Sequence, residues 1–282
     1  MKIYDCFTFY NEFELLELRL QQHWDIVDQF VIVESDHTFQ NTPKPYLLKD
    51  NWDRFSKWHG KMRLVTIKSS QHKDPWINER VQREAILEGI TDADPRDMIV
   101  IGDVDEVLRH ETFARLKTGT AGIYGFRMPL FNFKLNYMLT TTGSVYCVWN
   151  SAVRRNLLDS PEEFRRMRHA LNSFPLDYDD DTIAIVEHAG WHWTYFGNED
   201  FARAKIQGFA HSETNKPEIL NQLNIEESIQ AGRGIIRTDT EHVFCPVVVD
   251  KYFPDIVKST THIIPATHSA WDFLPESANY AK

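Results

Sequence analysis

The first hundred residues alternate between short apolar runs and helical patterns that are apolar on one side. The runs cover residues 3–10, 30–33, 62–67 and 98–101. They show little polar alternation, which is typical of strands buried on both faces of a sheet. Residues 12–24 repeat apolar side chains at helical spacing, and Asp74-Pro75 opens a second predicted helix over residues 76–90. This order predicts an α/β fold with a mostly parallel sheet and flanking helices.

After residue 106 the chain becomes richer in aromatic residues and turn-forming residues. The strands and helices predicted there cover residues 123–133, 144–149, 161–168, 199–210 and 217–230. The length fits one large domain or two small ones, and we place a single domain at residues 1–240. We expect this domain to have two halves, 1–106 and 107–240. Residues 241–282 show little periodicity and are expected to form a tail packed on the domain.

The apolar run at residues 98–101 ends at Gly102. It is followed by three carboxylates in four residues, Asp103, Asp105 and Glu106. A buried strand delivers these side chains to its carboxyl edge, where open α/β sheets bind ligands. Carboxylate oxygens suit Mg²⁺ or Mn²⁺, and such an ion can bridge to a diphosphate. An Asp-x-Asp pair is common, however, so this motif alone favours a solvated acidic turn.

Two further groups of side chains have both a structural and a functional interpretation. Arg83 shares a helix face with Arg80 and faces either a phosphate or neighbouring glutamates such as Glu79. Residues 188–195 combine histidines and tryptophans that are costly to bury without partners. This segment forms either an aromatic core with satisfied histidines or a wall of an active site, and the sequence leaves both open.

Composition excludes several classes of protein. The 282 residues carry a formal net charge of -10, which disfavours nucleic acid or an anionic membrane surface as a partner. Cys6, Cys147 and Cys245 are far apart, which indicates reduced thiols and no cysteine metal cluster. Without a signal peptide or an apolar run of ~18 residues, no transmembrane segment is expected, and the predicted location is the cytoplasm or, through partners, a membrane surface. The glycine-rich loops of Rossmann dinucleotide folds and P-loop proteins are missing.

Five ordered blocks of sequence resemble glycosyltransferase family 17, which includes β-1,4-mannosyl-glycoprotein 4-β-N-acetylglucosaminyltransferases. The blocks are DCFTFYNE at 5–12, VIVES at 31–35, WI at 76–77 with Arg83, DVDE at 103–106 and AGWH at 189–192. The resemblance covers roughly residues 1–240. It implies a GT-A fold whose first half binds the nucleotide and whose second half binds the acceptor. It also implies inversion at the anomeric carbon, UDP-GlcNAc as donor and a glycan as acceptor.

The same resemblance assigns roles to residues at the donor. Asp105 would bind Mn²⁺ or Mg²⁺ directly, and Asp103 would reach ribose or a metal-bound water. His192 is the predicted third metal ligand. The remaining donor-binding residues are predicted to be Arg83 at the diphosphate, with Asn11 and Glu34 lining the nucleoside.

Roles at the acceptor are less specific. Inversion needs a general base to take a proton from the acceptor hydroxyl. Glu106, Asp181, Glu187 and Glu213 are the possible bases, and Glu187 is favoured because it adjoins the Trp/His segment. Trp191 and Trp193 are predicted to stack on sugar rings.

Two other functions use the same features. In a metal-dependent phosphodiesterase or nucleotidyltransferase, the carboxylates at the strand end would hold two ions, and cleavage would fall between phosphates. A non-catalytic carbohydrate-binding protein would keep the sheet and bind sugar regardless of UDP or metal. Neither explains the five ordered blocks.

Overall fold

The computed structural model describes residues 1–141, 146–221, 223–235 and 243–276. In this part of the chain the strands form one mixed sheet in the order β11-β7-β6-β8-β4-β1-β2-β3, with β10, β5 and β9 paired off this path. Its parallel half, β3-β2-β1-β4, comes from the first hundred residues. β8 and β6 then continue the sheet in antiparallel pairing. The prediction of a mostly parallel sheet therefore holds only for the N-terminal half.

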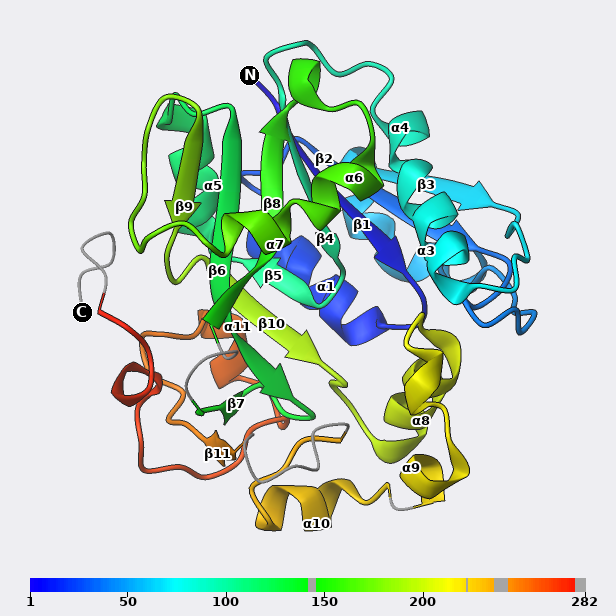
Figure 1. The fold of residues 1–282 in the computed structure, drawn as a ribbon, viewed down its shortest axis with the longest axis vertical. Helices are drawn as coiled ribbons and strands as arrows, with labels where there is room; N and C mark the ends of the chain where they lie inside the picture. The colour runs from blue at the N-terminus through cyan, green and yellow to red at the C-terminus, as the bar shows by residue number, and fades with distance from the viewer. Residues whose placement is uncertain (142–145, 222, 236–242, 277–282) are drawn as a thin grey trace.

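The elements are shown in Figure 1. The strands are β1 (Ile3–Phe9), β2 (Gln29–Ser35), β3 (Met62–Ile67), β4 (Met98–Asp103), β5 (Glu106–Leu108), β6 (Ile123–Asn132), β7 (Tyr137–Leu139), β8 (Tyr146–Arg154), β9 (Ile183–Val186), β10 (Gly190–Thr194) and β11 (Phe244–Pro246). The α-helices are α1 (Phe13–His23), α2 (Leu47–Asp50), α3 (Pro75–Glu84), α4 (Ile86–Gly89), α5 (His110–Thr118), α6 (Pro161–Arg166), α7 (Arg168–Leu171), α8 (Glu199–Gly208), α9 (Pro217–Asn221), α10 (Ile225–Gln230) and α11 (Asp255–Lys258). Four 3₁₀ helices are η1 (Trp52–Lys61), η2 (Arg155–Leu157), η3 (Ser212–Thr214) and η4 (Ala270–Asp272).

The sequence predicted the positions of most helices and strands, but not the points at which three of the predicted helices are interrupted. The predicted strands at 3–10, 30–33, 62–67 and 98–101 match β1 to β4, and the helix at 12–24 matches α1. The helix predicted over 76–90 is divided into α3 and α4 at Ala85, and the one over 161–168 is divided into α6 and α7. The helix over 217–230 is replaced by α9 and α10. Residues 144–145 of the predicted strand at 144–149 lie outside the described residues.

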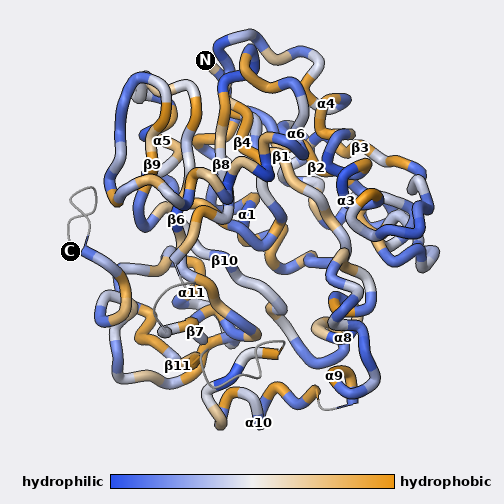
Figure 2. The backbone as a smooth tube through the Cα atoms, in the orientation of Figure 1, coloured by the Kyte–Doolittle hydropathy of each residue, from blue (hydrophilic) through white to orange (hydrophobic). Residues whose placement is uncertain are grey.

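The core forms on both faces of the sheet. Leu16 and Leu20 of α1 pack with Phe7 and Ile32 on one face, while Val31 and Ile86 belong to a cluster on the other. Figure 2 shows hydrophobic positions along the central strands and hydrophilic positions on outer loops and helices such as α3. Continuous apolar strands are explained by this two-sided burial.

Residues after 243 pack against the second half of the sheet. β11 pairs with β7 in antiparallel orientation. Val247, Tyr252 and Val257 lie in one buried cluster with Trp191 and Trp193 of β10. In the described part of the chain, no helix is long and apolar enough to cross a membrane.

A buried ion pair lies on the core side of the turn that follows β4. Arg19 of α1 donates to Asp5 of β1 through Nε at 2.8 Å and Nη2 at 2.5 Å, and both side chains are fully buried. Its Nη1 donates to the carbonyl oxygens of Asp103 at 2.8 Å and Glu106 at 3.0 Å. Burial alone would raise the pKa of Asp5, but Arg19 outweighs it and lowers this pKa to about 2. One guanidinium thus links α1, β1 and the acidic turn.

Replacing Arg19 with methionine is expected to lower the free energy of unfolding by about 3–5 kcal/mol, because Asp5 would remain buried without its partner. Glu17→Gln on the same helix is the control, since its pairs with Arg54 and Lys57 are exposed to solvent. That control should cost less than about 1 kcal/mol. Urea denaturation measures both values. Equal values for the two variants would contradict the role assigned to Arg19.

Candidate active site

A pocket of about 420 Å³ opens at the carboxyl ends of β1 and β4. Its walls come from segments far apart in sequence: the end of β1, the loop after β2, the turn at residues 103–106, the end of β10 and the segment that begins at the end of α8. The residues they contribute include Thr8, His37, Asp103, Asp105, His192, Thr194, Lys205 and His211. α8 lies beside the ends of β1 and β10 (Figure 1). The pocket therefore lies at the edge of the sheet where ligands bind in open α/β folds.

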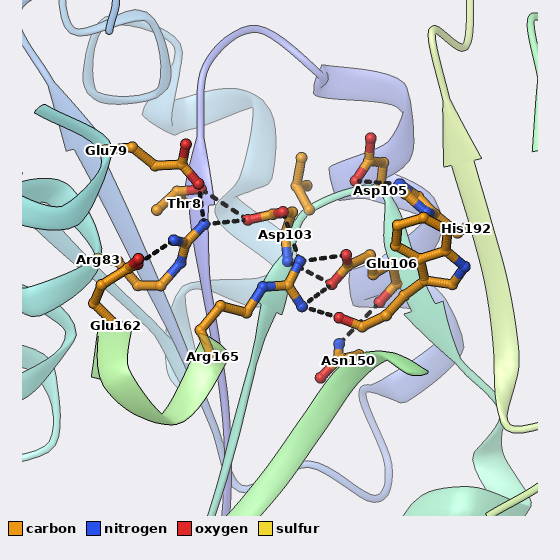
Figure 3. A network of polar contacts seen from close by, with 12 residues as sticks. Thr8, Glu79, Arg83, Asp103, Asp105, Glu106, Asn150, Glu162, Arg165 and His192 are labelled. Carbon is orange, nitrogen blue, oxygen red and sulfur yellow. Dashed lines mark hydrogen bonds and ion pairs between the residues drawn. The ribbon is translucent and has the colours of Figure 1, made fainter. Parts of the chain in front are cut away.

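Asp103 faces two guanidinium groups on one side of this pocket. Its carboxylate lies 3.1 Å from Arg83 and 2.9 Å from Arg165, and its side chain is 35% exposed (Figure 3). Burial alone would raise the pKa of Asp103, but Arg165 and Arg83 together hold it well below its usual range. Asp103 is thus ionised and already paired with positive charge.

Arg83, predicted to bind the donor diphosphate, is almost completely enclosed by carboxylates. It pairs with Glu79 at 2.7 Å and Glu162 at 2.5 Å as well as with Asp103, and its side chain is 3% exposed. Three carboxylates already balance its charge, which argues against the predicted role at the diphosphate. The pairing of Arg83 with Glu79 agrees with the predicted alternative of a glutamate partner, but Arg83 itself is buried and only Glu79 is partly exposed.

Glu106 does not fit the role of a general base. Both of its oxygens bind Arg165, at 2.5 and 2.9 Å, and one also accepts the backbone N–H of Asp103 at 3.0 Å. Its side chain is buried. With both oxygens engaged by Arg165 and only 1% of its side chain exposed, Glu106 has no exposed oxygen to offer an acceptor hydroxyl. Glu106 therefore fixes Arg165 and the turn.

Asp105 points away from Asp103 and toward a second group of side chains (Figure 3). Its Oδ2 accepts a hydrogen bond from Lys205 Nζ of α8 at 2.6 Å, and its Oδ1 lies 3.6 Å from Nε2 of His192. Glu12 Oε1 lies 3.9 Å from the same Nζ. Burial would lower the pKa of Lys205, but Asp105 and Glu12 outweigh it and raise this pKa. We call the place of this ammonium group the cation position.

The cation position provides part of the predicted metal site. Burial lowers the pKa of His192, which favours the neutral imidazole that binds metals. Within the described residues, no three His, Cys, Asp or Glu side chains come together as a ready metal site, because Asp103 turns toward the arginines. Asp105 and His192 nevertheless suit Mg²⁺ or Mn²⁺, which proteins often hold with one or two carboxylates while substrate phosphates complete the shell. The ammonium group already there shows that the place accommodates a cation.

Three other predicted site residues lie outside this pocket. Glu34 is buried and accepts hydrogen bonds from Leu48 N at 3.1 Å and Lys44 Nζ at 3.2 Å, so it ties α2 to β2. Asn11 lines a separate hollow beside α1. Glu187 is buried 2.8 Å from Arg127. None of the three lines the described pocket wall, so they do not fit nucleoside binding or proton transfer there.

Trp191 and Trp193 do not fit the predicted role in sugar stacking. Each is 1% exposed, and their rings stack on one another at 5.3 Å. Trp193 Nε1 donates to the carbonyl of Leu135 at 2.9 Å. Because side chains alternate along a strand, His192 and Thr194 face the pocket while the two indoles face the core. The two tryptophans therefore belong to the aromatic core, whereas His192 lines the pocket wall.

Sequence reasoning missed two cations at the pocket. Arg168 lines the wall, and in the described part of the chain it forms no ion pair with a carboxylate. Repulsion by Arg165, together with burial, lowers its pKa to about 10. Its spacing of three residues from Arg165 was a usable signal, since it places both on one side of a helical turn. Lys205 had no such signal.

The mouth of the pocket carries an exposed indole and a His–Glu pair. Trp76, at the start of α3, is 47% exposed and meets the ring of His211 edge-on at 4.6 Å. His211 Nδ1 lies 2.6 Å from Glu213 Oε1, and both residues line the pocket. Burial would raise the pKa of Glu213, but the hydrogen bond to His211 lowers it.

The family model described as glycosyltransferase family 17 matches residues 1–263. No curated protein matches the chain. A solved mannosyltransferase, PcManGT from Pyrobaculum calidifontis in complex with GDP-Man and Mn²⁺, is similar with 14% identity and a TM-score of 0.39, covering 80% of this chain and 69% of that one.

Two nucleotidyltransferase structures show a comparable level of similarity. A 4-diphosphocytidyl-2C-methyl-D-erythritol synthase has 15% identity and a TM-score of 0.36 over 66% of this chain and 88% of its own. A glucose-1-phosphate thymidylyltransferase from Bacillus anthracis, described as putative and in complex with a sucrose, has 8% identity and a TM-score of 0.38 over 68% and 88%.

Trp191→Ala is expected to lower the free energy of unfolding by about 3–5 kcal/mol, because it removes a fully packed indole from the core. Trp76→Ala is the matched control, since that indole is largely exposed, and it should change stability by less than about 1 kcal/mol. Guanidinium denaturation followed by circular dichroism measures both. If Trp191→Ala left stability unchanged and altered only ligand binding, the core assignment would be wrong.

Proposed function

Because this chain belongs to glycosyltransferase family 17, we propose that it transfers GlcNAc from UDP-GlcNAc to a glycan hydroxyl, forming a β linkage with inversion. The observation that carries this proposal is the pairing of two features in one pocket. These are the cation position at Asp105 and the guanidinium of Arg168, which has no carboxylate partner in the part of the chain that the structure describes. Together they provide the charge that a nucleoside diphosphate needs in an otherwise acidic protein.

Arg168 is the proposed ligand for the donor diphosphate, in place of Arg83. Its charge is not matched by a carboxylate among the described residues, whereas Arg83 is shared among three. A planar guanidinium can donate two parallel hydrogen bonds to a phosphate. Arg83 and Arg165 then serve to position the turn at residues 103–106.

Asp105 and His192 are the proposed metal ligands. A bound Mn²⁺ or Mg²⁺ would neutralise the charge that develops on departing UDP. Asp105 supplies a carboxylate oxygen and His192 a neutral imidazole. Asp103 keeps a partly exposed carboxylate facing the pocket, and we assign it to a ribose hydroxyl rather than to direct metal ligation.

Glu213 is the proposed general base. It lines the pocket mouth, it is 61% exposed, and it is ionised at neutral pH, so an acceptor hydroxyl that enters the pocket meets an accessible carboxylate. The hydrogen bond to His211 lowers its pKa and makes it a weaker base than a free glutamate, so its accessibility and not its pKa supports this role. Glu187, favoured on sequence, is buried against Arg127 outside the pocket. Because Glu213 and His211 belong to the second half of the domain, this assignment supports the proposal that residues 107–240 bind the acceptor.

Asp105→Asn is expected to lower kcat/KM for UDP release from UDP-GlcNAc by at least about a hundredfold, or 2.7 kcal/mol, because one carboxylate ligand is lost. EDTA should have a similar effect on the parent protein, and added Mn²⁺ should reverse it. Asp255→Asn, on an exposed carboxylate paired with Lys258, is the control. Turnover that survives both chelation and the substitution would remove the metal role. Release of UMP instead of UDP would identify phosphodiester cleavage.

Glu213→Gln is expected to lower kcat by roughly 10²–10⁴-fold with little change in KM for the donor, because the variant loses the proton acceptor but keeps the shape of the side chain. Glu187→Gln is the comparison. It should lower the free energy of unfolding and leave kcat nearly unchanged, because Glu187 is buried against Arg127 outside the pocket. Steady-state kinetics and thermal unfolding separate the two effects. Loss of kcat in Glu187→Gln alone would return the base to Glu187.

A further inference from the structure

Lys205 occupies the place that a metal ion would need at Asp105. Its ammonium group is only 2.6 Å from Asp105 Oδ2, and its side chain is 15% exposed. The next carboxylate oxygen is that of Glu12, at 3.9 Å, and the ring of Tyr195 lies 5.7 Å away. Lys205 therefore makes a close charge-assisted pair with the one aspartate of the Asp-x-Asp motif that faces away from the arginines.

A divalent ion bound to Asp105 would stand next to this ammonium group. An ion on Oδ2, at a metal–oxygen distance of about 2.0–2.2 Å, would fall within the space that Nζ fills. An ion on Oδ1, beside His192, would stand next to the same positive charge and be repelled by it. We propose that Lys205 and the divalent cation compete for Asp105, so that metal binding displaces Lys205. Lys205 is then the residue that sets metal affinity, and it keeps Asp105 compensated when metal is absent.

The displacement needs no movement of α8. The end of this helix is fixed to the loop after β2, since Phe39 N donates to Gly208 O at 2.9 Å. Gln40 Nε2 donates to the carbonyls of Ile206 at 3.0 Å and Phe209 at 2.9 Å. Lysine has a long flexible stem, so rotation of its side chain is sufficient. Glu12 is the adjacent carboxylate that can receive the displaced ammonium group.

The inference rests on the metal site of the proposed function, and it is tested with Mn²⁺ alone. Binding of Mn²⁺ to the full chain is measured by the electron paramagnetic resonance signal of the free ion. Lys205→Met is expected to bind Mn²⁺ at least about tenfold more tightly than the parent, as for a typical coupling between two ligands. Lys205→Arg, which keeps the positive charge, should not show this gain.

Lys44→Met is the matched control. Lys44 also lines the pocket, but it pairs with Glu34 at 3.2 Å rather than with Asp105. Its removal should leave Mn²⁺ affinity nearly unchanged, which separates displacement at Asp105 from a general loss of positive charge. Asp105→Asn should weaken Mn²⁺ binding in the Lys205→Met background.

Lys205→Gln repeats the comparison with a polar side chain, so that a folding defect in the methionine variant does not decide the result. In this variant Mn²⁺ should also raise the melting temperature by more than in the parent. Equal Mn²⁺ affinity in the parent and the Lys205 variants would overturn the proposal, and so would the absence of binding in all of them. Failure of the transferase proposal would appear separately, as absent UDP release from UDP-GlcNAc.

Discussion

The buried guanidinium of Arg19 is the constraint on which the site depends. It donates hydrogen bonds to the carbonyl oxygens of Asp103 and Glu106, while Asp5 of β1 neutralises its charge. The backbone of the acidic turn is therefore fixed by a buried side chain of α1 that reaches it from the core. Because that backbone is fixed, the side chains above it point in defined directions instead of sharing one solvated acidic surface.

The consequence is that the two aspartates of one short motif do different work. Asp103 compensates Arg83 and Arg165, and Asp105 faces the cation position with His192 and Lys205. Both groups balance negative charge with positive charge inside a chain whose net charge is -10. A pocket organised in this way can accept an anionic diphosphate without relying on an overall positive surface.

The two halves of the chain contribute in different ways. The parallel strands of the first hundred residues place the carboxylates at one edge of the sheet. The later, mixed part of the sheet brings β10, α7 and α8 around that edge and supplies His192, Arg168 and Lys205. The first half of the chain thus supplies the acidic turn, while the second half supplies the positively charged groups and the histidine that complete the pocket.

Sequence by itself determined β1 to β4, helix α1 and the delivery of carboxylates to the end of β4, because these depend on local hydrophobic periodicity and on chain order. It also identified the family. Only the tertiary structure decided which charges pair: Lys205 meets Asp105 across 100 positions, and Arg83 loses its free charge to Glu162 and Asp103. Alternation along β10 separates His192 from Trp191, but which face is the core depends on what packs against it. Such contacts join residues far apart in the chain, so local sequence patterns do not predict them.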